Sequence, residues 1–334
     1  MPNPTHSDLH VSRALTDISL AHANDPANFA SESIFPIVNV ANRTDKFFEF
    51  DRDDWFRVAA ENRAPGAEAP VGGYRVATQS YICDRVSLAI DIDDPSRANA
   101  DPAVANLDAD ATMFLTENIR MKNDVDFQTN FFTTGLWDGA SGSTDMTGQS
   151  NPTSTTINFL QWNDVASTPI EDIRGEMLSI QSNTGRKPNT LALGPQVWRH
   201  LGDHPDILDR IKYTERGIVT EDLLASLWGL ERVVVLSATR NTGEQGSTSP
   251  SYGFIAGKAA LLAYVAPSPG LRQPSAGYTF VWAGRPGAPT GGLAARIKRF
   301  RIERNESDRI EAEVWKDQKL TGSAYGAFFA TATA

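Results

Sequence analysis

The chain has 334 residues, of which 40% are apolar and 22% are charged. An ordinary domain has ~100–200 residues, so the length predicts two domains, or one domain with large extensions. The composition is that of a globular protein that buries a sizeable core. The 31 Lys and Arg residues against 41 Asp and Glu residues give a formal net charge of −10. This acidic balance argues against a protein whose main task is to clamp nucleic acid, because phosphate binding needs a basic face.

Cysteine content and hydropathy exclude further classes of protein. The single cysteine, Cys83, rules out a disulfide framework and a zinc site built from several cysteines. The most apolar long run, residues 254–266, has 13 residues and contains Lys258, whereas a membrane-spanning helix needs ~20 apolar residues. We therefore expect no membrane span, and the first residues lack the pattern of a signal peptide.

The N-terminal part of the chain is predicted to form an arm followed by a long hairpin. Residues 1–45 are polar with short apolar pieces, which is typical of an arm that contains a short helix. Residues 47–50 and 81–90 are rich in aromatic and β-branched side chains and predict two strands. The segment 63–74 is rich in Pro and Gly and predicts the hairpin tip. An isolated hairpin is marginal in water, so we expect another surface to cover it.

Residues 101–131 are predicted to form an unusually long helix. Asp101 and Pro102 are a favourable start, because an acidic N-cap residue precedes proline at the first helical position. Apolar residues then follow at helical spacing, with few breakers before Gly135. Some 30 residues would give a rod of roughly 45 Å, well beyond the ~11–12 residues of a typical helix. A second helix is predicted over 168–182.

From residue 189 the pattern changes to short alternating elements, which is typical of a compact α/β unit. The predicted strands are 191–193, 233–236, 260–265 and 278–282, and the predicted helices are 195–201, 205–212 and 221–228. The chain then ends in a predicted hairpin, with a basic strand over 296–302, a turn at 305–308 and a partner strand. In the partner strand, apolar residues alternate with Glu311 and Glu313.

The basic strand of this terminal hairpin holds the one marked cluster of cations, which are Arg296, Lys298, Arg299 and Arg301. These side chains could contact phosphate, with Phe300 available for stacking on a base. The simpler interpretation is that they pair with Glu311 and Glu313 across the hairpin. Both interpretations stay open.

The candidate segments for catalysis and cofactor binding lack residues that the known motifs require. Residues 253–258 differ from a phosphate-binding loop, because three residues instead of four separate the glycines and Ala259 follows the lysine. His200 and His204 have the spacing of two metal ligands on one helix face, but Gly202 interrupts that face. We interpret the two histidines as exposed polar residues at a helix junction.

The remaining reactive or acidic groups also favour structural roles. Acidic residues gather at 51–54 and 91–94, and we interpret them as solvated turns or ion partners instead of a cation site. Cys83 is interpreted as a buried small apolar residue. The sequence therefore predicts no catalytic, metal-binding or cofactor-binding residue, no cofactor and no enzyme.

Several stretches occur in one order along nearly the whole chain and together carry a resemblance to a known family. They are DWFRVAAENRAPGAEAPVGGY at 54–74, TQSYICD at 78–84, DPAVANLDADATMFLTE at 101–117, DFQTNFFTTGLW at 126–137, LLASLWGLERVVVLSATRN at 223–241 and YGFIAGKAALLAYVAPSPGL at 252–271. With these stretches the chain resembles the major capsid proteins of tailed bacteriophages, which have the Hong Kong 97-type fold. The order of the pieces makes the resemblance more specific than any single motif.

The resemblance implies an α+β fold of the Hong Kong 97 (HK-97) type with four parts. These are an N-terminal arm at 1–45, an extended loop at 46–90, a peripheral domain with a long spine helix at 91–188 and 290–334, and an axial α/β domain at 189–289. The implied function is that of a subunit which assembles as hexamers and pentamers into the icosahedral shell around a double-stranded DNA genome. Two alternative hypotheses are that the chain is a bacterial nanocompartment shell protein of the same fold, or a two-domain α/β enzyme.

The resemblance also implies partners and a location. We expect the chain to bind copies of itself, a separate scaffolding protein and a portal, and to enclose DNA without sequence-specific binding; a decoration protein stays open. The expected location is the virion, after assembly in the cytoplasm of the host bacterium. Some members of the family cross-link covalently through a lysine on the extended loop. The only lysine between residues 45 and 121 is Lys46, at the hairpin base, so no cross-link is expected.

The extended loop is expected to supply the contacts between subunits. Its aromatic side chains would anchor it on a neighbour, and its charged side chains would form ion pairs there. The residues expected in this role are Trp55, Phe56, Arg57, Glu61, Arg63, Glu68 and Tyr74.

Overall fold

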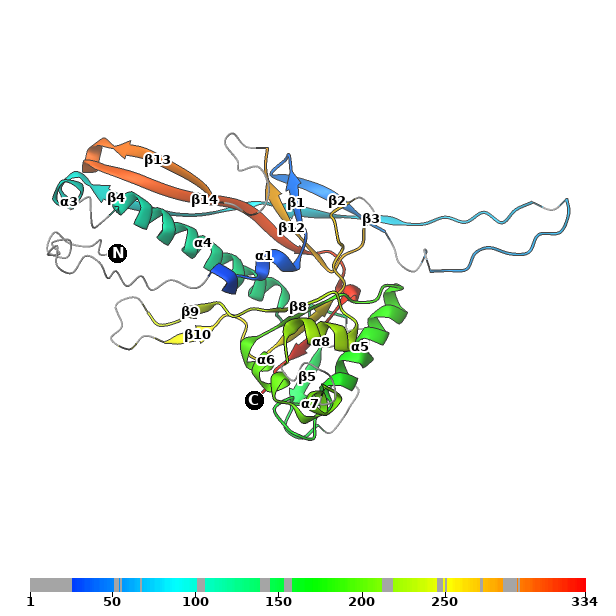
Figure 1. Cartoon of the computed structure of the whole chain (residues 1–334). Coiled ribbons are helices and arrows are strands. Elements are labelled where there is room, and N and C mark those ends of the chain that lie inside the picture. The colour runs from blue at the N-terminus through cyan, green and yellow to red at the C-terminus, as the bar shows by residue number, and fades with distance from the viewer. Residues whose placement is uncertain are drawn as a thin grey trace.

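A computed structural model describes most of the chain. The described residues are 26–50, 54, 56–66, 68–100, 106–138, 145–152, 158–211, 219–244, 249, 251–270, 273–284, 293 and 295–334. They form a long helix that lies on a sheet, a compact α/β unit, and a two-stranded hairpin that projects from the body (Figure 1). This mixture confirms the predicted α+β class.

The first sheet is organised around one long strand. It contains β1 (Ile37–Val40), β4 (Asp84–Asp93), β12 (Gly277–Trp282), β13 (Arg296–Ile302) and β14 (Ser307–Leu320). Strand β4 pairs with one edge of β14, while β13 and β12 pair with successive parts of its other edge. Strand β1 extends this sheet by pairing in parallel with β12. The terminal hairpin of β13 and β14 therefore lies where the sequence predicts it.

The long helix α4 (Leu107–Phe131) packs against this sheet. Ala111, Leu115 and Ile119 recur at four-residue spacing, so they share one helix face, and they pack with apolar residues of β14 such as Val314. The helix has 25 residues and begins later than expected. Asn106 is its N-cap and accepts a hydrogen bond from the backbone N–H of Ala109 at 3.2 Å. The predicted start at residues 101–102 is wrong for this helix, and those two residues lie outside the described part.

The second sheet forms the core of the compact unit. Its order is β6 (Asn158–Leu160), β5 (Met146–Gln149), β15 (Gly326–Ala330), β11 (Ala260–Ala263), β7 (Thr190–Leu193) and β8 (Arg232–Val235). The accompanying helices are α5 (Pro169–Thr184), α6 (Pro195–Gly202), α7 (Pro205–Ile211) and α8 (Glu221–Trp228). Helix α5 ends where Gly185 adopts φ of 66°, a conformation that glycine accepts readily. The helices predicted in this unit are confirmed to within a few residues.

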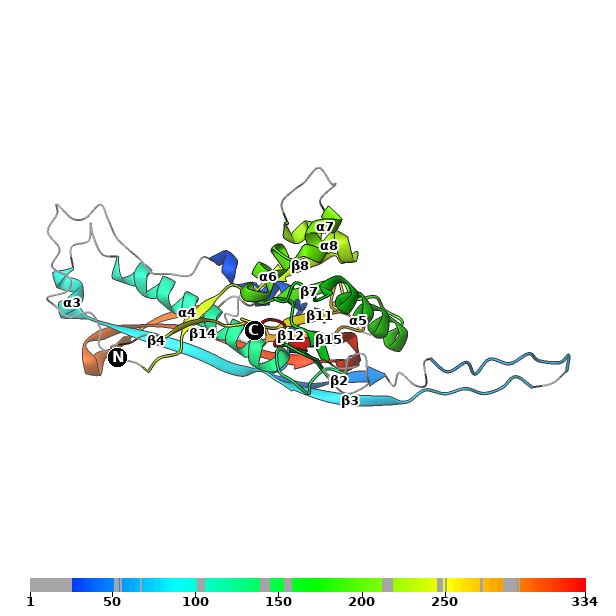
Figure 2. The ribbon, with the colours of Figure 1, turned by 90° about the horizontal axis from the view of Figure 1, so that it is seen from below.

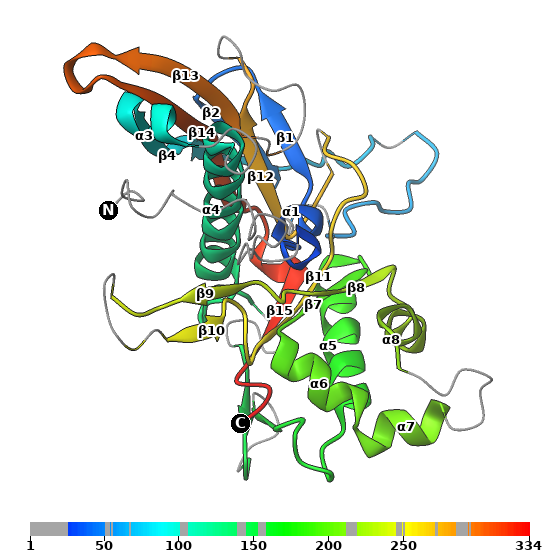
Figure 3. The ribbon, with the colours of Figure 1, turned by 60° about the vertical axis from the view of Figure 1, so that its left-hand side comes forward.

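The two faces of the second sheet are covered by different parts of the chain. Leu191 and Leu193 of β7 face helices α5 to α8. Ala192 between them lies in a second cluster with Phe127 and Phe131 from the C-terminal half of α4. Successive strand residues point to opposite faces, so β7 is buried on both sides. Helix α4 therefore contributes to the cores of both sheets (Figures 1 and 3).

Sheet membership differs in two places from the division along the sequence. Strand β12 falls in the range 189–289 but pairs in the first sheet with β14 and β1. Strand β15 falls in the range 290–334 but pairs in the second sheet with β11 and β5. Both are short apolar strands, and their pattern does not indicate which partner edge receives them.

The projecting hairpin is built from β2 (Thr44–Phe50) and β3 (Val76–Ile82), which pair antiparallel from Thr44 opposite Ile82 to Phe50 opposite Val76. The single strand predicted over 81–90 is divided at Cys83. Up to Ile82 it pairs with β2, and from Asp84 it is β4 and pairs with β14. The hairpin is thus a direct continuation of the first sheet, and its far end extends well beyond the body (Figure 2).

The other described elements are short. They are the 3-10 helices Pro26–Asn28, Glu303–Asn305 and Ser323–Tyr325, the helices α1 (Ser31–Ile34) and α3 (Asp94–Asn99), and the two-stranded sheet of β9 (Thr239–Asn241) and β10 (Tyr252–Phe254).

We predict that Leu115→Ala weakens the junction between α4 and the first sheet. Leu115 is fully buried, and removing its methyl groups leaves a cavity, so the free energy of unfolding should fall by about 2–5 kcal/mol. Urea denaturation of the purified subunit measures this change. Met113→Ala is the matched control, because Met113 lies on the same helix but is 61% exposed. Equal losses in the two variants would contradict the packing described for α4.

Candidate functional site

The projecting hairpin is the most exposed part of the first sheet and its extensions, since most of residues 56–80 are exposed. The hairpin is therefore the first candidate for a functional surface.

The hairpin presents apolar side chains that stay largely exposed in the single chain. Val58 is 89% exposed and Val71 is 99% exposed. Phe56, Tyr74 and Phe48 are also large, apolar and more than half exposed. Exposed apolar groups gathered on one element mark a surface that binds another molecule. The far part of the hairpin is therefore suited to lie against a second protein surface.

The predicted charged residues of the hairpin lie on the same exposed segment. Arg57, Glu61, Arg63 and Glu68 are all exposed, and among the described residues no salt bridge or hydrogen bond engages their side chains. Trp55, the remaining predicted contact, lies outside the described residues. The hairpin thus carries both signs of charge beside its apolar residues, which is a composition suited to a specific contact.

Phe56 has a contact within its own chain. A Cβ atom placed on Gly185 would come 3.1 Å from the Phe56 ring, so the ring lies close to the backbone at the end of α5. Phe56 nevertheless keeps 60% of its surface exposed. It connects the start of the projecting segment to the compact unit and still offers a face to a partner.

An ion pair that the sequence analysis missed holds the two sides of the hairpin together. Arg75 donates to Asp54 from its backbone N–H and from Nε, both at 2.9 Å. The hydrogen bond from the Arg75 side chain keeps the pKa of Asp54 below its ordinary value. The sequence does contain two opposite charges, Asp54 and Arg75, on either side of the hairpin tip. Only the register of the hairpin shows that these two residues lie opposite each other, so the sequence alone did not predict their ion pair.

The base of the hairpin is fixed to the first sheet by aromatic stacking. The ring of Tyr81 stacks on Phe280 of β12 with centroids 4.5 Å apart, and Phe47 lies on the same ring at 5.6 Å. Cys83 is fully buried beside them, and burial raises the pKa of its thiol to about 12. The interpretation of Cys83 as a buried small apolar residue is confirmed.

The basic strand β13 is neutralised by acidic residues of its own chain. Glu313 on β14 is 3% exposed and receives Lys298 at 2.7 Å and Arg296 at 3.7 Å. Arg85 from β4 reaches the same carboxylate at 2.9 Å and also pairs with Glu311. These contacts match the interpretation in which the cations pair across the hairpin.

The other two predicted cations are also paired. Arg299 contacts Asp308 at 2.8 Å and Asp108 of α4 at 3.1 Å. Arg301 pairs with Asp94 and Asp308. The hydrogen bond that Arg299 donates to the Asp308 carboxylate lowers the pKa of Asp308 and raises the pKa of Arg299. A partner that sought these cations would have to compete with carboxylates already in place.

The groups tested for catalysis have structural roles in the described residues. His204 is buried, which corrects the expectation that it is exposed. Its Nδ1 accepts the backbone N–H of Asp206 at 3.2 Å, and its Nε2 lies 2.9 Å from the Ser167 hydroxyl, so it ties the start of α7 to a neighbouring loop. In the acidic segment 91–94, Asp91 pairs with Arg309 at 2.6 Å. The acidic residues 51–53 lie outside the described part.

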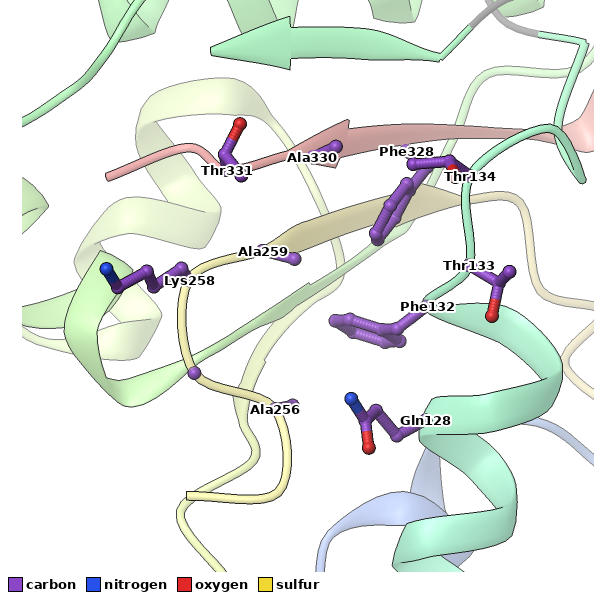
Figure 4. Close-up of a pocket in the computed structure, with 11 residues that line it drawn as sticks. Gln128, Phe132, Thr133, Thr134, Ala256, Lys258, Ala259, Phe328, Ala330 and Thr331 are labelled. Carbon is purple, nitrogen blue, oxygen red and sulfur yellow. The ribbon is translucent and has the colours of Figure 1, made fainter. Parts of the chain in front are cut away.

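The described residues contain no group of three or more His, Cys, Asp or Glu side chains placed to hold a metal ion. None of its helices is long and apolar enough to cross a membrane. A pocket of about 380 Å³ opens where α4 ends, between Phe132, Phe328 and the loop 256–259 (Figure 4). Lys258 is the only ionisable residue in its lining, and its side chain extends away from the two rings. This lining offers no acid–base pair.

Comparison with known proteins gives one relative in sequence and several in structure. No protein-family model matches the chain. The sequence is 27% identical, over 282 residues, to the major capsid protein of Burkholderia phage BcepMu, and the match covers 83% of this chain and 85% of that protein. Both chains are therefore covered over most of their length.

Solved structures share the fold at lower sequence identity. A phage-related protein from Bordetella bronchiseptica RB50 has a TM-score of 0.65 and 20% identity, and the match covers 92% of this chain and 94% of that one. The capsid of the cyanophage P-SCSP1u has a TM-score of 0.60 and 10% identity, with 98% and 94% covered. An encapsulin complex from Synechococcus elongatus PCC 7942 has a TM-score of 0.52 and 11% identity, with 97% of each chain covered. These likenesses confirm the fold that the sequence resemblance predicts.

We predict that Glu313→Ala destabilises the first sheet, because it leaves Arg85, Arg296 and Lys298 facing one another without the buried carboxylate. Removing one partner of a fully buried pair costs about 3–5 kcal/mol. The three cations are partly exposed and screened, so we expect a loss of about 2–3 kcal/mol in the free energy of unfolding. Chemical denaturation measures it. The exposed Glu303, changed to Ala, should cost less than about 0.5 kcal/mol; a comparable loss there would contradict the special role of Glu313.

Proposed function

We propose that this chain, which has the Hong Kong 97-type fold, is the major capsid protein of a tailed bacteriophage and that its copies assemble as hexamers and pentamers into an icosahedral shell around double-stranded DNA. The observation that carries the proposal is the projecting hairpin with its uncovered apolar residues, on a chain similar in sequence to a phage major capsid protein. The similarity indicates a structural role in a capsid and no enzymatic activity.

The proposed contact between subunits lies along the hairpin. Val58 and Val71 would be covered by a neighbouring copy together with the exposed faces of Phe56 and Tyr74. The proposal retains every predicted residue, that is Trp55, Phe56, Arg57, Glu61, Arg63, Glu68 and Tyr74. Burying an apolar side chain contributes about 1.5–3 kcal/mol, so a shell that repeats this contact at every subunit gains a large total stability from one interface.

The division into an arm at 1–45, an extended loop at 46–90, a peripheral domain at 91–188 and 290–334, and an axial domain at 189–289 is kept as a proposal. We also propose that the chain binds a separate scaffolding protein and a portal. Whether it binds a decoration protein stays open. Assembly in the cytoplasm of the host bacterium also belongs to the proposal. The virion is the location that a capsid role implies.

Packaged DNA that lies against β13 would meet cations that are already engaged. Lys298 and Arg301 pair with carboxylates of the same chain, and the chain carries a net charge of −10. Such a surface holds DNA without binding it tightly, because tight binding would require uncommitted cations that release counterions from phosphate. The exposed ring of Phe300 is the remaining group of β13 that could contact a base.

A nanocompartment shell is the second candidate, because an encapsulin complex shares the fold. The two candidates differ in what the particle encloses. Nuclease-resistant DNA inside purified particles would support the capsid, whereas a protein cargo without DNA would support the nanocompartment.

We predict that Val58→Asp combined with Val71→Asp abolishes particle formation. Both side chains are almost fully exposed in the single chain, so the free energy of unfolding of the subunit should change by less than about 0.5 kcal/mol. A charge at either position would have to be desolvated at the interface, which opposes assembly. Electron microscopy and light scattering at micromolar protein measure the particles.

The matched control for this experiment is Val58→Thr combined with Val71→Thr, which keeps the shape of both side chains and adds no charge. Particles should form from the Thr variant and from the unaltered chain but not from the Asp variant. Normal particles from the Asp variant would contradict the assigned interface. A chain that stays monomeric in every form and condition would contradict the proposed function itself.

We also predict that assembled shells contain no covalent links between subunits, since Lys46 is the only lysine between residues 45 and 121. Boiling purified shells in denaturant should release subunits of 36.4 kDa, as seen by gel electrophoresis. A ladder of larger bands would show this prediction to be wrong.

A further inference from the structure

The segment that leads into the first sheet is anchored on the long helix. We call residues 26–35 the arm root. At its end, Phe35 is buried, and its ring lies 5.6 Å from that of Phe127 and 4.6 Å from that of Phe131, centroid to centroid. Helix α1 of the arm root lies beside the C-terminal half of α4 (Figures 1 and 3). The apolar end of the arm root is thus fixed by the core.

A buried polar contact joins the other end of α1 to the same helix. The Ser31 hydroxyl donates a hydrogen bond to Oδ1 of Asp124, and both side chains are buried. Asn123 Nδ2 donates to the Glu32 carboxylate at 3.3 Å. The second oxygen of Asp124, Oδ2, is buried and has no hydrogen-bond partner within the described residues. A buried carboxylate with one unsatisfied oxygen is costly when it is charged.

The nearby charges do not neutralise Asp124 directly. Lys316 of β14 is almost fully buried and pairs with Asp126 at 2.9 Å, and Lys122 on α4 pairs with the same Asp126. Glu32 of α1 adds a further negative charge. Facing the arm root from β8, Arg232 donates to the backbone oxygen of Ile34 at 2.8 Å. Both lysines are therefore committed to Asp126, while Asp124 is held by a neutral hydroxyl.

Burial raises the pKa of Asp124 from its ordinary 3.8 to about 6. The Ser31 hydrogen bonds and the Lys316 charge oppose this rise, and the Glu32 charge adds to it. Because the docked state raises this pKa, docking is favoured when Asp124 is protonated. The added stability is fully present below about pH 4 and is lost as the pH rises through about 6. Burial also lowers the pKa of Lys316, which Asp126 opposes.

We propose that Ser31 and Asp124 form a proton-controlled latch between the arm root and helix α4. When Asp124 is neutral, the arm root is held firmly on the helix. When Asp124 is charged, α1 separates from the helix more readily, while Phe35 keeps its apolar contacts. The latch lies within one chain, so it goes beyond the proposed shell function and does not require assembly.

Hydrogen exchange on the unassembled full-length chain tests the latch. Backbone amides of residues 28–34 should be about tenfold better protected at about pH 5 than at about pH 7, after correction for the intrinsic pH dependence of exchange. The factor takes the ordinary aspartate value of 3.8 as the pKa of Asp124 in the separated state and about 6 as its pKa in the docked state. Equal protection at the two pH values would overturn the proposal.

Two variants assign the effect to Asp124. Asp124→Asn keeps the shape and removes the titration, so protection should be the same at both pH values. Asp110→Asn changes an exposed carboxylate on the same helix and should keep the tenfold difference. A pH dependence that survives in Asp124→Asn, or disappears in Asp110→Asn, would contradict the latch.

A third variant serves if Asp124→Asn does not fold. Ser31→Ala removes a donor that lowers the pKa of Asp124, so protection should fall at about pH 7 and the difference between the two pH values should widen. A narrower difference would overturn the proposal. The absence of particles under the microscope would contradict the proposed function and leave this exchange result unaffected, so the two failures are distinguishable.

Discussion

The burial of helix α4 by two separate cores is the interaction on which the rest of the structure depends. Its N-terminal half places Leu115 and Ile119 against β14. Its C-terminal half places Phe127 and Phe131 under the second sheet and against the arm root. One rigid helix therefore packs against both sheets and helps to set their relative position.

The direction of the projecting hairpin is set by the first sheet. Strand β3 continues into β4 at Cys83, and β4 is paired with β14 along ten residues. Stacking on Phe280 fixes the hairpin base as well. The far end, with Val58 and Val71, is consequently held away from the core that could otherwise cover it. This arrangement is unfavourable for a single subunit and suits a protein whose copies cover one another, as a shell requires.

Charge is arranged so that strong local pairs leave little free cation on the described surface of β13. Glu313 is surrounded by three cations, and Asp308 links Arg299 and Arg301. At the arm root the opposite holds, since no described cation forms a salt bridge with the buried Asp124, which is held by the Ser31 hydroxyl. The same chain therefore uses ion pairs to fix the sheet and a buried carboxyl held by a neutral group to make one attachment responsive to protons.

The sequence by itself determined the long helix except for its start, the helices of the compact unit, the terminal hairpin and the presence of the projecting hairpin. These features depend on local signals, namely the periodicity of apolar residues, helix caps such as Gly185, and the Pro and Gly residues of the hairpin tip. The tertiary structure alone decided that β12 joins the first sheet and β15 the second, that the strand over 81–90 is divided at Cys83, and that His204 is buried. It also decided that Ser31 meets Asp124, which is 93 residues away along the chain. The physical reason is that short apolar strands and single polar side chains carry no local signal for their partner, which is fixed only when distant segments compete for the same edge or the same buried space.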